Sequence, residues 1–196
     1  MAEQERGACV AVRPYREQDK QAVRDICVAT SGLPDGASPE QKRRLLLQYC
    51  DYYVEQEPEA CFVAENEAGE PVGYILCAAD FKAYRRRFLR NYLPQIRALD
   101  RRRAFAVRLE LWLMGRFARH YPAHMHIDIL TPFQRRGIGH RLVDALTASL
   151  AGRRIRGLML IVGAENEKGV RFYEKYGFQR LAGVQDALVM GLQVSK

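Results

Sequence analysis

The spacing of apolar residues divides the chain into expected strands and helices. Between His124 and Ile129, apolar and polar residues alternate, which is typical of a strand with one buried face. The continuous apolar run at residues 157–162 indicates a strand that is covered on both faces. Similar short patterns, bounded by turn residues, occur elsewhere. The predicted strands lie at residues 9–13, 60–65, 71–78, 124–129, 157–162, 178–181 and 187–193.

Where apolar residues recur every three or four positions, the chain is expected to be helical. Leu142 and Leu146 belong to one such series, which follows the alternating stretch. Ser38, directly before Pro39, is the expected N-cap of one helix, and Gly177 is expected to end another. The predicted helices lie at residues 17–30, 39–53, 142–150 and 166–176, with two or three more between 80 and 121.

A basic loop that contains two glycines joins the alternating strand to the helix behind it. From Gln134 to Gly139 it reads Gln-Arg-Arg-Gly-Ile-Gly. The first amides of a helix lack internal partners and lie at the positive end of its dipole, so they attract anions. Neither GxxxxGK[ST] nor a complete GxGxxG is present. The loop therefore predicts a phosphate or pyrophosphate site, and the alternative is an ordinary helix start with a solvated basic face.

Three polar residues share one face of the alternating strand. His124, His126 and Asp128 are two positions apart, so their side chains point the same way. Buried polar groups need partners, which makes such a row unusual in a central strand. Asp128 or His126 is a candidate base or orienting group, and a structural hydrogen-bond network is the alternative. A metal site at His-x-His-x-Asp is not expected, because no second set of ligands is evident.

Composition adds limits on the class of protein. The 196 residues are 48% hydrophobic and 28% charged, which predicts one globular domain over residues 1–196. No apolar run is long enough to span a bilayer, and no signal peptide is evident, so a cytoplasmic protein without a membrane partner is expected. Five cysteines without a CxxC pair are expected to be reduced thiols.

Positive charge is the most marked property of the chain. The net charge is +8, which suits nucleic acid or a polyanionic cofactor such as coenzyme A (CoA) equally. Part of it lies in two arginine triplets, at residues 85–87 and 101–103, within an expected helical insertion that also has Pro94 near a helix start. The triplets are expected to be solvated faces and helix-end charges. The alternative is a basic lid over phosphates or nucleic acid.

Two motifs resemble a known family. Gln-x-x-Gly-x-Gly after a strand resembles the acetyl-CoA loop of the GNAT acetyltransferase superfamily. Residues 166–178, Asn-x-x-Gly-Val-Arg-Phe-Tyr-Glu-Lys-Tyr-Gly-Phe, resemble the GNAT segment N-x-x-A-x-x-F-Y-x-x-x-G-F, with Gly169 in place of alanine. A narrower resemblance lies at 121–130, Tyr-Pro-Ala-His-Met-His-Ile-Asp-Ile-Leu. It is similar to acetyltransferase-like domains of or related to O-GlcNAcases, although the proline that follows in that group stands one position later here, at Pro132.

The resemblance implies an α+β, layered α/β/α fold. Its mixed, mostly antiparallel sheet splays between strands 4 and 5, with a helical insertion at about 80–120. It also implies acetyl-CoA as cosubstrate, with the pantetheine arm in the splay and Tyr173 near the sulfur. The expected acetyl-CoA-binding residues are Ile129, Leu130, Thr131, Gln134, Arg135, Arg136, Gly137, Ile138, Gly139, His140, Asn166 and Tyr173.

The function implied is that of an N-acetyltransferase. A tyrosine hydroxyl can protonate a departing thiolate, and Tyr173 matches the family residue in that role, with Asp128 and His126 as candidates for the base. The acceptor is an unidentified primary amine, on a small molecule or on a protein lysine or N-terminus. One alternative is a CoA-binding module without activity. A nucleic-acid-binding protein ranks last, because no recognition motif supports it, and a homodimer is left open.

Overall fold

A seven-stranded sheet forms the centre of the protein, in the order β1-β2-β3-β4-β5-β7-β6. The computed structural model describes residues 10–184 and 186–194, so the predicted start of the first strand at Cys9 lies outside them. The sheet is antiparallel except for the parallel pair β4–β5. The strands are β1 (Ala11–Pro14), β2 (Phe62–Glu65), β3 (Pro71–Ala78), β4 (Ala123–Ile129), β5 (Gly157–Gly163), β6 (Gln179–Val184) and β7 (Ala187–Gln193).

The helices follow the predicted periodicity with one correction. Ser38 caps α2 as expected, in a reciprocal capping box with Gln41. The helix expected to run on past Tyr49 breaks at Cys50, which lets Tyr52 and Tyr53 turn fully into the core. The helices are η1 (Glu17–Asp19), α1 (Lys20–Thr30), α2 (Pro39–Tyr49), α3 (Asp51–Gln56), η2 (Pro58–Ala60), α4 (Phe81–Asn91), α5 (Leu93–Leu99), α6 (Arg101–Gly115), η3 (Thr131–Phe133), α7 (Ile138–Gly152) and α8 (Glu167–Tyr176).

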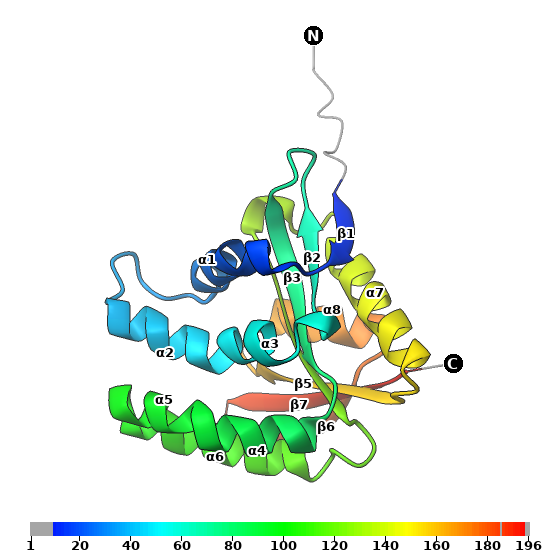
Figure 1. Ribbon diagram of the computed structural model, residues 1–196. Coiled ribbons are helices and arrows are strands. Elements are labelled where there is room, and N and C mark those ends of the chain that lie inside the picture. Colours follow the sequence, from blue (N-terminus) through cyan, green and yellow to red (C-terminus); the bar gives the residue numbers. More distant parts are fainter. Residues whose placement is uncertain (1–9, 185, 195–196) are drawn as a thin grey trace.

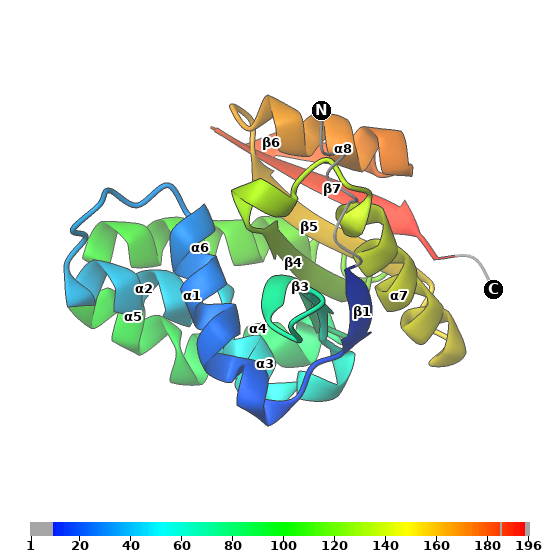
Figure 2. The same ribbon diagram turned by 90° about the horizontal axis from the view of Figure 1, so that it is seen from above.

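Helices cover both faces of the sheet, as the layered α/β/α prediction requires (Figures 1 and 2). One apolar cluster joins α1 to α6 to one face, through residues such as Tyr74 and Met159. A second cluster joins α7 and α8 to the other face, through residues such as Leu142 and Val170. Among the helices that the structure describes, none is long and apolar enough to cross a bilayer.

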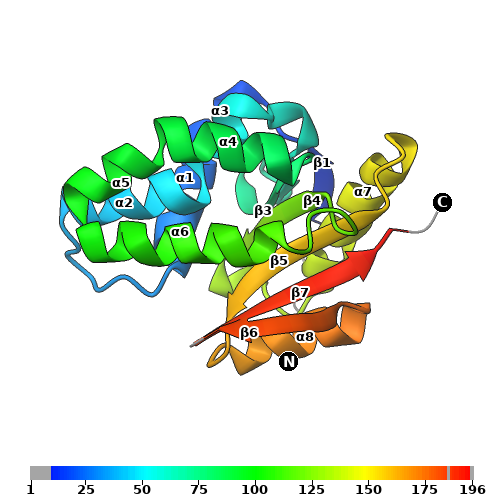
Figure 3. The same ribbon diagram turned by 90° about the horizontal axis from the view of Figure 1, so that it is seen from below.

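The segment between β3 and β4 forms three helices, as predicted, and Pro94 lies in the first turn of α5 (Figure 3). The two ends of this insertion meet, because the amide of Phe81 donates to the carbonyl of Pro122 at 2.7 Å. On its outer side, α6 exposes Phe105 (73% exposed) and Trp112 (52%). Arg116 lies over the Trp112 ring at 5.7 Å.

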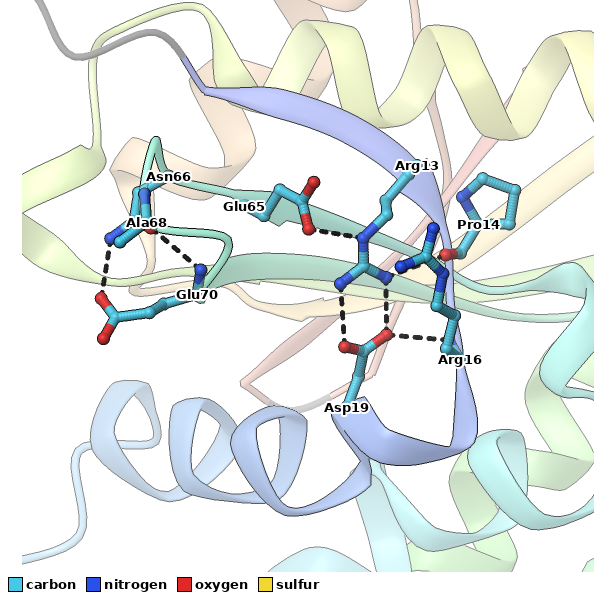
Figure 4. A network of polar contacts seen from close by, with 8 residues as sticks. All are labelled: Arg13, Pro14, Arg16, Asp19, Glu65, Asn66, Ala68 and Glu70. Atoms are coloured by element: carbon cyan, nitrogen blue, oxygen red, sulfur yellow. Dashed lines mark hydrogen bonds and ion pairs between the residues drawn. The ribbon is translucent and has the colours of Figure 1, made fainter.

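A charged cluster joins β1 to β2 and to the short helix η1 that precedes α1 (Figure 4). The guanidinium of Arg13 donates to both carboxylate oxygens of Asp19, at 2.7 and 2.9 Å, and to Glu65 at 2.5 Å. Burial would raise the pKa of Asp19, but the bonds from Arg13 and from the Arg16 amide hold it below its usual value. The bidentate geometry makes this pair stronger than an ordinary surface ion pair.

The sheet opens between its two parallel strands. β3 and β4 pair over six positions, whereas β4 and β5 pair only at Ala123–Leu158 and His124–Met159. From His126 onward, the β5-facing edge of β4 has no β5 partner, so its backbone groups can bond a ligand, apart from the Ile129 carbonyl, which accepts from the Gln134 side chain. The predicted splay between strands 4 and 5 is therefore present, and it lies beside the polar row on β4.

Candidate active site

The loop between β4 and α7 has the backbone geometry of an anion site. Arg135 (φ 60°) and Gly137 (φ 74°) both adopt the left-handed conformation. Left-handed residues interspersed in this way turn successive amides toward one concave side, which suits an anion. α7 begins at Ile138 after Gly137, which has no side chain to cap its amides. The first turn of α7 therefore offers donors at the positive end of the helix dipole.

Glycine is favoured at two positions of this loop for different structural reasons. A Cβ at Gly137 would have no neighbour within 4 Å, so the positive φ alone favours glycine there. A Cβ at Gly139 would lie 3.0 Å from the Phe172 ring of α8. Gly139 thus permits close packing of α7 against α8, a role that the sequence analysis did not assign to it.

The end of β4 is arranged for main-chain contacts along the open edge. The Leu130 amide donates to Val72 on β3 at 3.0 Å, and its carbonyl accepts from Phe133 at 2.9 Å. By the two-residue alternation of a strand, Ile129 turns its backbone groups toward β5. The Ile129 carbonyl accepts from the Gln134 side chain at 2.9 Å. Of the three residues predicted to bond the pantetheine arm, Leu130 therefore has both backbone groups engaged within the chain.

Asp128 is held by a tyrosine on the neighbouring strand. Tyr74 pairs directly with it across β3 and β4, and the Tyr74 hydroxyl donates to its carboxylate at 2.5 Å. Burial raises the pKa of Asp128 to about 6, while hydrogen bonds from Tyr74 and Thr30 act against the rise. The carboxyl group thus changes its charge near neutral pH, as a general base must. Sequence reasoning did not single out Tyr74 or Thr30.

The two histidines of the row differ from Asp128. His124 is only 2% exposed, and its Nδ1 lies 2.9 Å from the Tyr53 hydroxyl. Burial, followed by His126, moves its pKa well below the usual value. Burial also lowers the pKa of His126 to about 4, and the Tyr49 ring meets its ring edge-on at 5.1 Å. Both imidazoles are therefore neutral at pH 7. In the described residues, no three His, Cys, Asp or Glu side chains are grouped to hold a metal ion.

α8 supplies the remaining predicted residues. Tyr173 packs between the rings of Phe172 and Phe178, with centroids 5.2 and 5.4 Å away. Burial raises the pKa of its hydroxyl, and the negative charge of Asp128 raises it further. Asn166 caps α8 by accepting from the Gly169 amide at 2.9 Å. A Cβ at position 169 would lie 2.7 Å from the Asn166 side chain, which explains the glycine there.

A cavity of about 320 Å³ lies beyond the point where β4 and β5 separate. It shares Tyr49 with the surroundings of His126 and continues along β5. Its charged lining comprises one arginine and three acids, in a chain whose net charge is +8. The lining residues are Tyr49, Arg103, Ala106, Leu109, Glu110, Leu113, Ile161, Val162, Gly163, Glu165, Asp186 and Ala187.

The single cation of this cavity is already engaged. Arg103 donates to the Tyr49 hydroxyl at 2.8 Å and to Gln48 at 2.9 Å, and it pairs with Glu110 at 3.1 Å. Glu110 is largely buried, which raises its pKa, while Arg103 acts in the opposite direction. The carboxylates of Glu165 and Asp186 are exposed, so the cavity as a whole favours positive charge.

Residues 21–178 match the acetyltransferase (GNAT) family. The chain belongs to the GNAT family of acetyltransferases. Members use acetyl-CoA as cosubstrate, and the loop, the splay and the uncapped start of α7 in this GNAT protein fit that molecule. Its pyrophosphate is an anion for the loop amides, and its amide-bearing arm can bond an open strand edge.

Solved structures resemble this GNAT chain over nearly its full length. SsHAT is 28% identical, with a TM-score of 0.83, and the match covers 95% of this chain and 99% of that one. The structure of yncA from Salmonella typhimurium with its cofactor acetyl-CoA is 15% identical, with a TM-score of 0.59 and 95% of each chain covered. The Escherichia coli ribosomal-protein-S18-alanine N-acetyltransferase is 16% identical, at a TM-score of 0.58 with 96% of each covered. The last two show likeness of fold alone.

The two arginine triplets of this GNAT protein do not form one surface. Residues 101–103 begin α6, while residues 85–87 lie on α4, which packs near the other end of α6. Arg103 is engaged at the cavity beside Tyr49, and Arg101 and Arg102 are exposed. The expectation of solvated faces and helix-end charges therefore holds for Arg101 and Arg102, whereas Arg103 is a structural residue.

Proposed function

We propose that this protein transfers the acetyl group of acetyl-CoA to a primary amine, with Asp128 as general base and Tyr173 as general acid. The observation that carries the proposal is the opening of the sheet between β4 and β5, which begins before Asp128 on β4. Asp128, a carboxyl group with a pKa of about 6, lies on the part of β4 that has separated from β5, and burial together with the charge of Asp128 raises the pKa of the partly buried Tyr173 hydroxyl. Their pKa values are pushed far apart, which is the arrangement expected of an acid and base pair.

Asp128 is a better candidate for the base than His126. At pH 7 a group with a pKa of about 6 is mostly ionised and still holds a proton well, whereas a pKa of about 4 makes His126 a weak base. We propose that the uncharged imidazole of His126 lines the acceptor site and orients the amine. The acceptor ammonium gives one proton to Asp128, and its lone pair then bonds the acetyl carbon as the carbon–sulfur bond breaks. Tyr173 gives its proton to the departing sulfur. The second proton that the nitrogen loses restores the Tyr173 hydroxyl, and Asp128 releases the first proton to water.

For the cosubstrate we propose contacts with the backbone of Ile129 and Thr131 and with the loop amides. Gln134, which already holds the Ile129 carbonyl, would fix the strand end for this contact. Asn166 caps α8 through its oxygen and keeps its amide donors for the pantetheine arm. The narrower likeness to O-GlcNAcase-related acetyltransferase-like domains rests on residues 121–130 and stays a prediction.

For the acceptor we propose an amine that carries a second positive charge. The cavity beside Tyr49 lies on the Asp128 face of the sheet, and its free charges at Glu165 and Asp186 are negative. A polyamine or a lysine beside other basic residues has the charge that such a lining attracts. The apolar walls, with Leu109 and Leu113, suit the methylene chain of either molecule.

Thermal unfolding with matched concentrations of acetyl-CoA, CoA, NADH and ATP tests the cosubstrate. A ligand at 100 times its dissociation constant stabilises the folded state by about 2.7 kcal/mol. We expect acetyl-CoA and CoA to raise the melting temperature selectively. Equal shifts with all four compounds would mean that the loop is only a basic surface, and the proposal would fail.

Tyr173→Phe separates an enzyme from an inactive CoA-binding module. The phenol proton is lost while the ring packing against Phe172 and Phe178 is kept, so acetyl-CoA affinity should change by less than about twofold. Turnover, followed as free thiol released in the presence of spermidine or a lysine peptide, should fall by about 100-fold or more. If turnover is the same over the whole pH range, Tyr173 is not the acid.

A further inference from the structure

A second cavity, on the outer side of the helical insertion, lies between α4 and the end of α6. Its volume is about 670 Å³, which is within the range of small-molecule sites. The two helices run past each other on this side of the molecule (Figure 3). We call this cavity the α4–α6 groove. It is lined by Phe81, Lys82, Arg85, Arg86, Leu89, Arg90, Gly115 and Ala118.

The charges of the α4–α6 groove are all positive. Lys82, Arg86 and Arg90 follow one another at intervals of four on α4, and Arg85 lies beside them. Like charges at this interval repel one another and destabilise a helix. In the part of the chain that the structure describes, none of the four pairs with a carboxylate. An anion in the groove would relieve this repulsion.

Arg85 gives an independent sign of a ligand. Its Nε is buried and has no hydrogen-bond partner among the described residues. Its guanidinium lies over Gly115, where a Cβ would be 3.4 Å from Nη1, so the absence of a side chain at 115 leaves room for it. A buried donor without a partner is costly, and in native structures it calls for a specific explanation.

The floor of the α4–α6 groove is apolar. Phe81 and Ala118 are buried core residues whose surfaces form the bottom of the groove, and Leu89 lies beside them. A small inorganic ion would leave this surface in contact with water. An anion with an apolar body would satisfy both the floor and the cationic rim.

The α4–α6 groove is separate from the acetyl-CoA loop. Phe81 bonds Pro122, directly before β4, whereas the loop follows the other end of β4 after Ile129. A strand of seven residues with a rise of about 3.3 Å each separates its ends by about 20 Å. The Phe81 ring also meets the His124 ring, at 5.9 Å, so an occupant would lie close to the core of the polar row.

We propose that the α4–α6 groove binds a small amphipathic anion, with one carboxylate, phosphate or sulfonate group on an apolar body. The anionic group lies between Arg85 and Arg86, and the Arg85 side chain turns so that its buried Nε reaches this group and gains a partner. The apolar body covers Phe81 and Leu89. This site does not depend on the acetyl-transfer reaction.

The probe for this site is 8-anilinonaphthalene-1-sulfonate, an aromatic ring system with one anionic group, in fluorescence titrations at 150 mM salt. Replacing Arg85 and Arg86 together by Gln should raise its dissociation constant at least tenfold. The matched control replaces Arg97 and Arg102, two exposed arginines of the same insertion, by Gln. Loss of the same charge there should change the constant by less than twofold. Equal weakening in both double variants would reduce the effect to net charge and overturn the proposal.

A second variant controls for loss of folding, and two competitors test the charge of the ligand. Gly115→Leu keeps every charge and fills the groove, so it too should weaken binding at least tenfold, with circular dichroism confirming the fold. Decanoate should displace the probe, and decylammonium, with the same chain and the opposite charge, should not. Displacement by both, or by neither, would contradict the proposal. Binding to phosphatidylglycerol vesicles that needs Arg85 and that decanoate does not compete would assign the groove to a membrane surface instead.

Discussion

Asp128 occupies surroundings that disfavour its charge, and this has opposite effects on stability and on chemistry. A carboxyl group whose pKa is raised in the folded state makes the protein most stable at low pH. That stability is lost as the pH rises from about 4, the unfolded value, through about 6, the folded value. The ionised form that a base needs is therefore the form that the fold tolerates less well.

Asp128→Asn should raise the stability of the protein at neutral pH and lower its turnover. At pH 7.5 the variant should be more stable than the parent protein, by up to about 3 kcal/mol for two pKa units, and the difference should vanish near pH 4. Turnover should fall by about 100-fold or more. The measurements are thermal unfolding and thiol release at a series of pH values.

The pH profile gives the control for this substitution. In the parent protein, turnover should rise with pH through about 6, as the carboxyl group loses its proton. If the variant keeps the same inflection near pH 6, another group is the base, and His126→Gln in the same assay would show whether it is the neighbouring imidazole.

At the same scale, the sequence identifies the polar row but not its partners. A period of two is enough to place His124, His126 and Asp128 on one face of a strand. Tyr74 faces Asp128 only because of the register between β3 and β4. That register spans the whole helical insertion, and nothing local in the sequence encodes it. The lowered pKa of His126 could not be predicted from the sequence either, because it arises from burial by residues that are distant in the chain.

At the scale of elements, the start of α7 depends on two glycines for two reasons that substitutions can separate. Gly137→Ala meets no neighbour but must hold a left-handed φ, which costs about 1–2 kcal/mol and displaces the amides of the loop. Gly139→Ala pushes a methyl group against Phe172, with a cost of about 1–3 kcal/mol. Urea unfolding measures both costs, and CoA titration should show weaker binding for Gly137→Ala.

Rescue distinguishes the two mechanisms. Phe172→Leu should recover part of the stability of Gly139→Ala and none of that of Gly137→Ala. Gly152→Ala, at the end of the same helix with open space around it, is the control and should not lower the stability. Recovery of Gly137→Ala by Phe172→Leu would mean that steric contact, not the backbone angle, constrains that position.

The boundaries of elements were predictable where a local signal exists. Ser38, Pro39 and Gly177 mark helix ends through hydrogen bonds and backbone angles that a few residues determine. The break of the α2 helix at Cys50 has no such signal. It depends on where Tyr52 and Tyr53 must point to be buried, which is a property of the assembled core.

At the scale of the whole molecule, the distribution of charge is more informative than its sum. The chain is strongly basic, yet the cavity next to Tyr49 is acidic and the α4–α6 groove is entirely basic. The layers and the splayed sheet followed from the motifs, because these carry a resemblance to a whole fold. Neither cavity was predictable, because α4 and α6 meet only after the insertion packs, and the cavity next to Tyr49 also requires β5 and the start of β7 beside α6.

Acceptor choice is the prediction that belongs to this scale. Spermidine or a lysine-rich peptide should be acetylated with a kcat/KM at least tenfold above that of an uncharged or acidic amine. Asp186→Asn and Glu165→Gln should raise the KM of the cationic acceptor and leave kcat within about twofold. The control is Glu174→Gln, an exposed acid on α8 outside the cavity. No preference for cationic amines would remove the assignment of this cavity to the acceptor.

The meeting of Phe81 with Pro122 has a consequence for how such a protein can be altered. Both ends of the insertion leave the sheet at one point, so β3 and β4 already have the geometry of an ordinary hairpin whose connection happens to be long. We expect that helices at this point can be lengthened, exchanged or replaced without changing the register of the strands that carry Tyr74 and Asp128, provided that the new helices cover the same apolar face of the sheet. The acetyl-CoA loop and β4 could then stay unchanged while the helices on the other face of the sheet are replaced. This junction is therefore a suitable site for recombination, in evolution or by engineering.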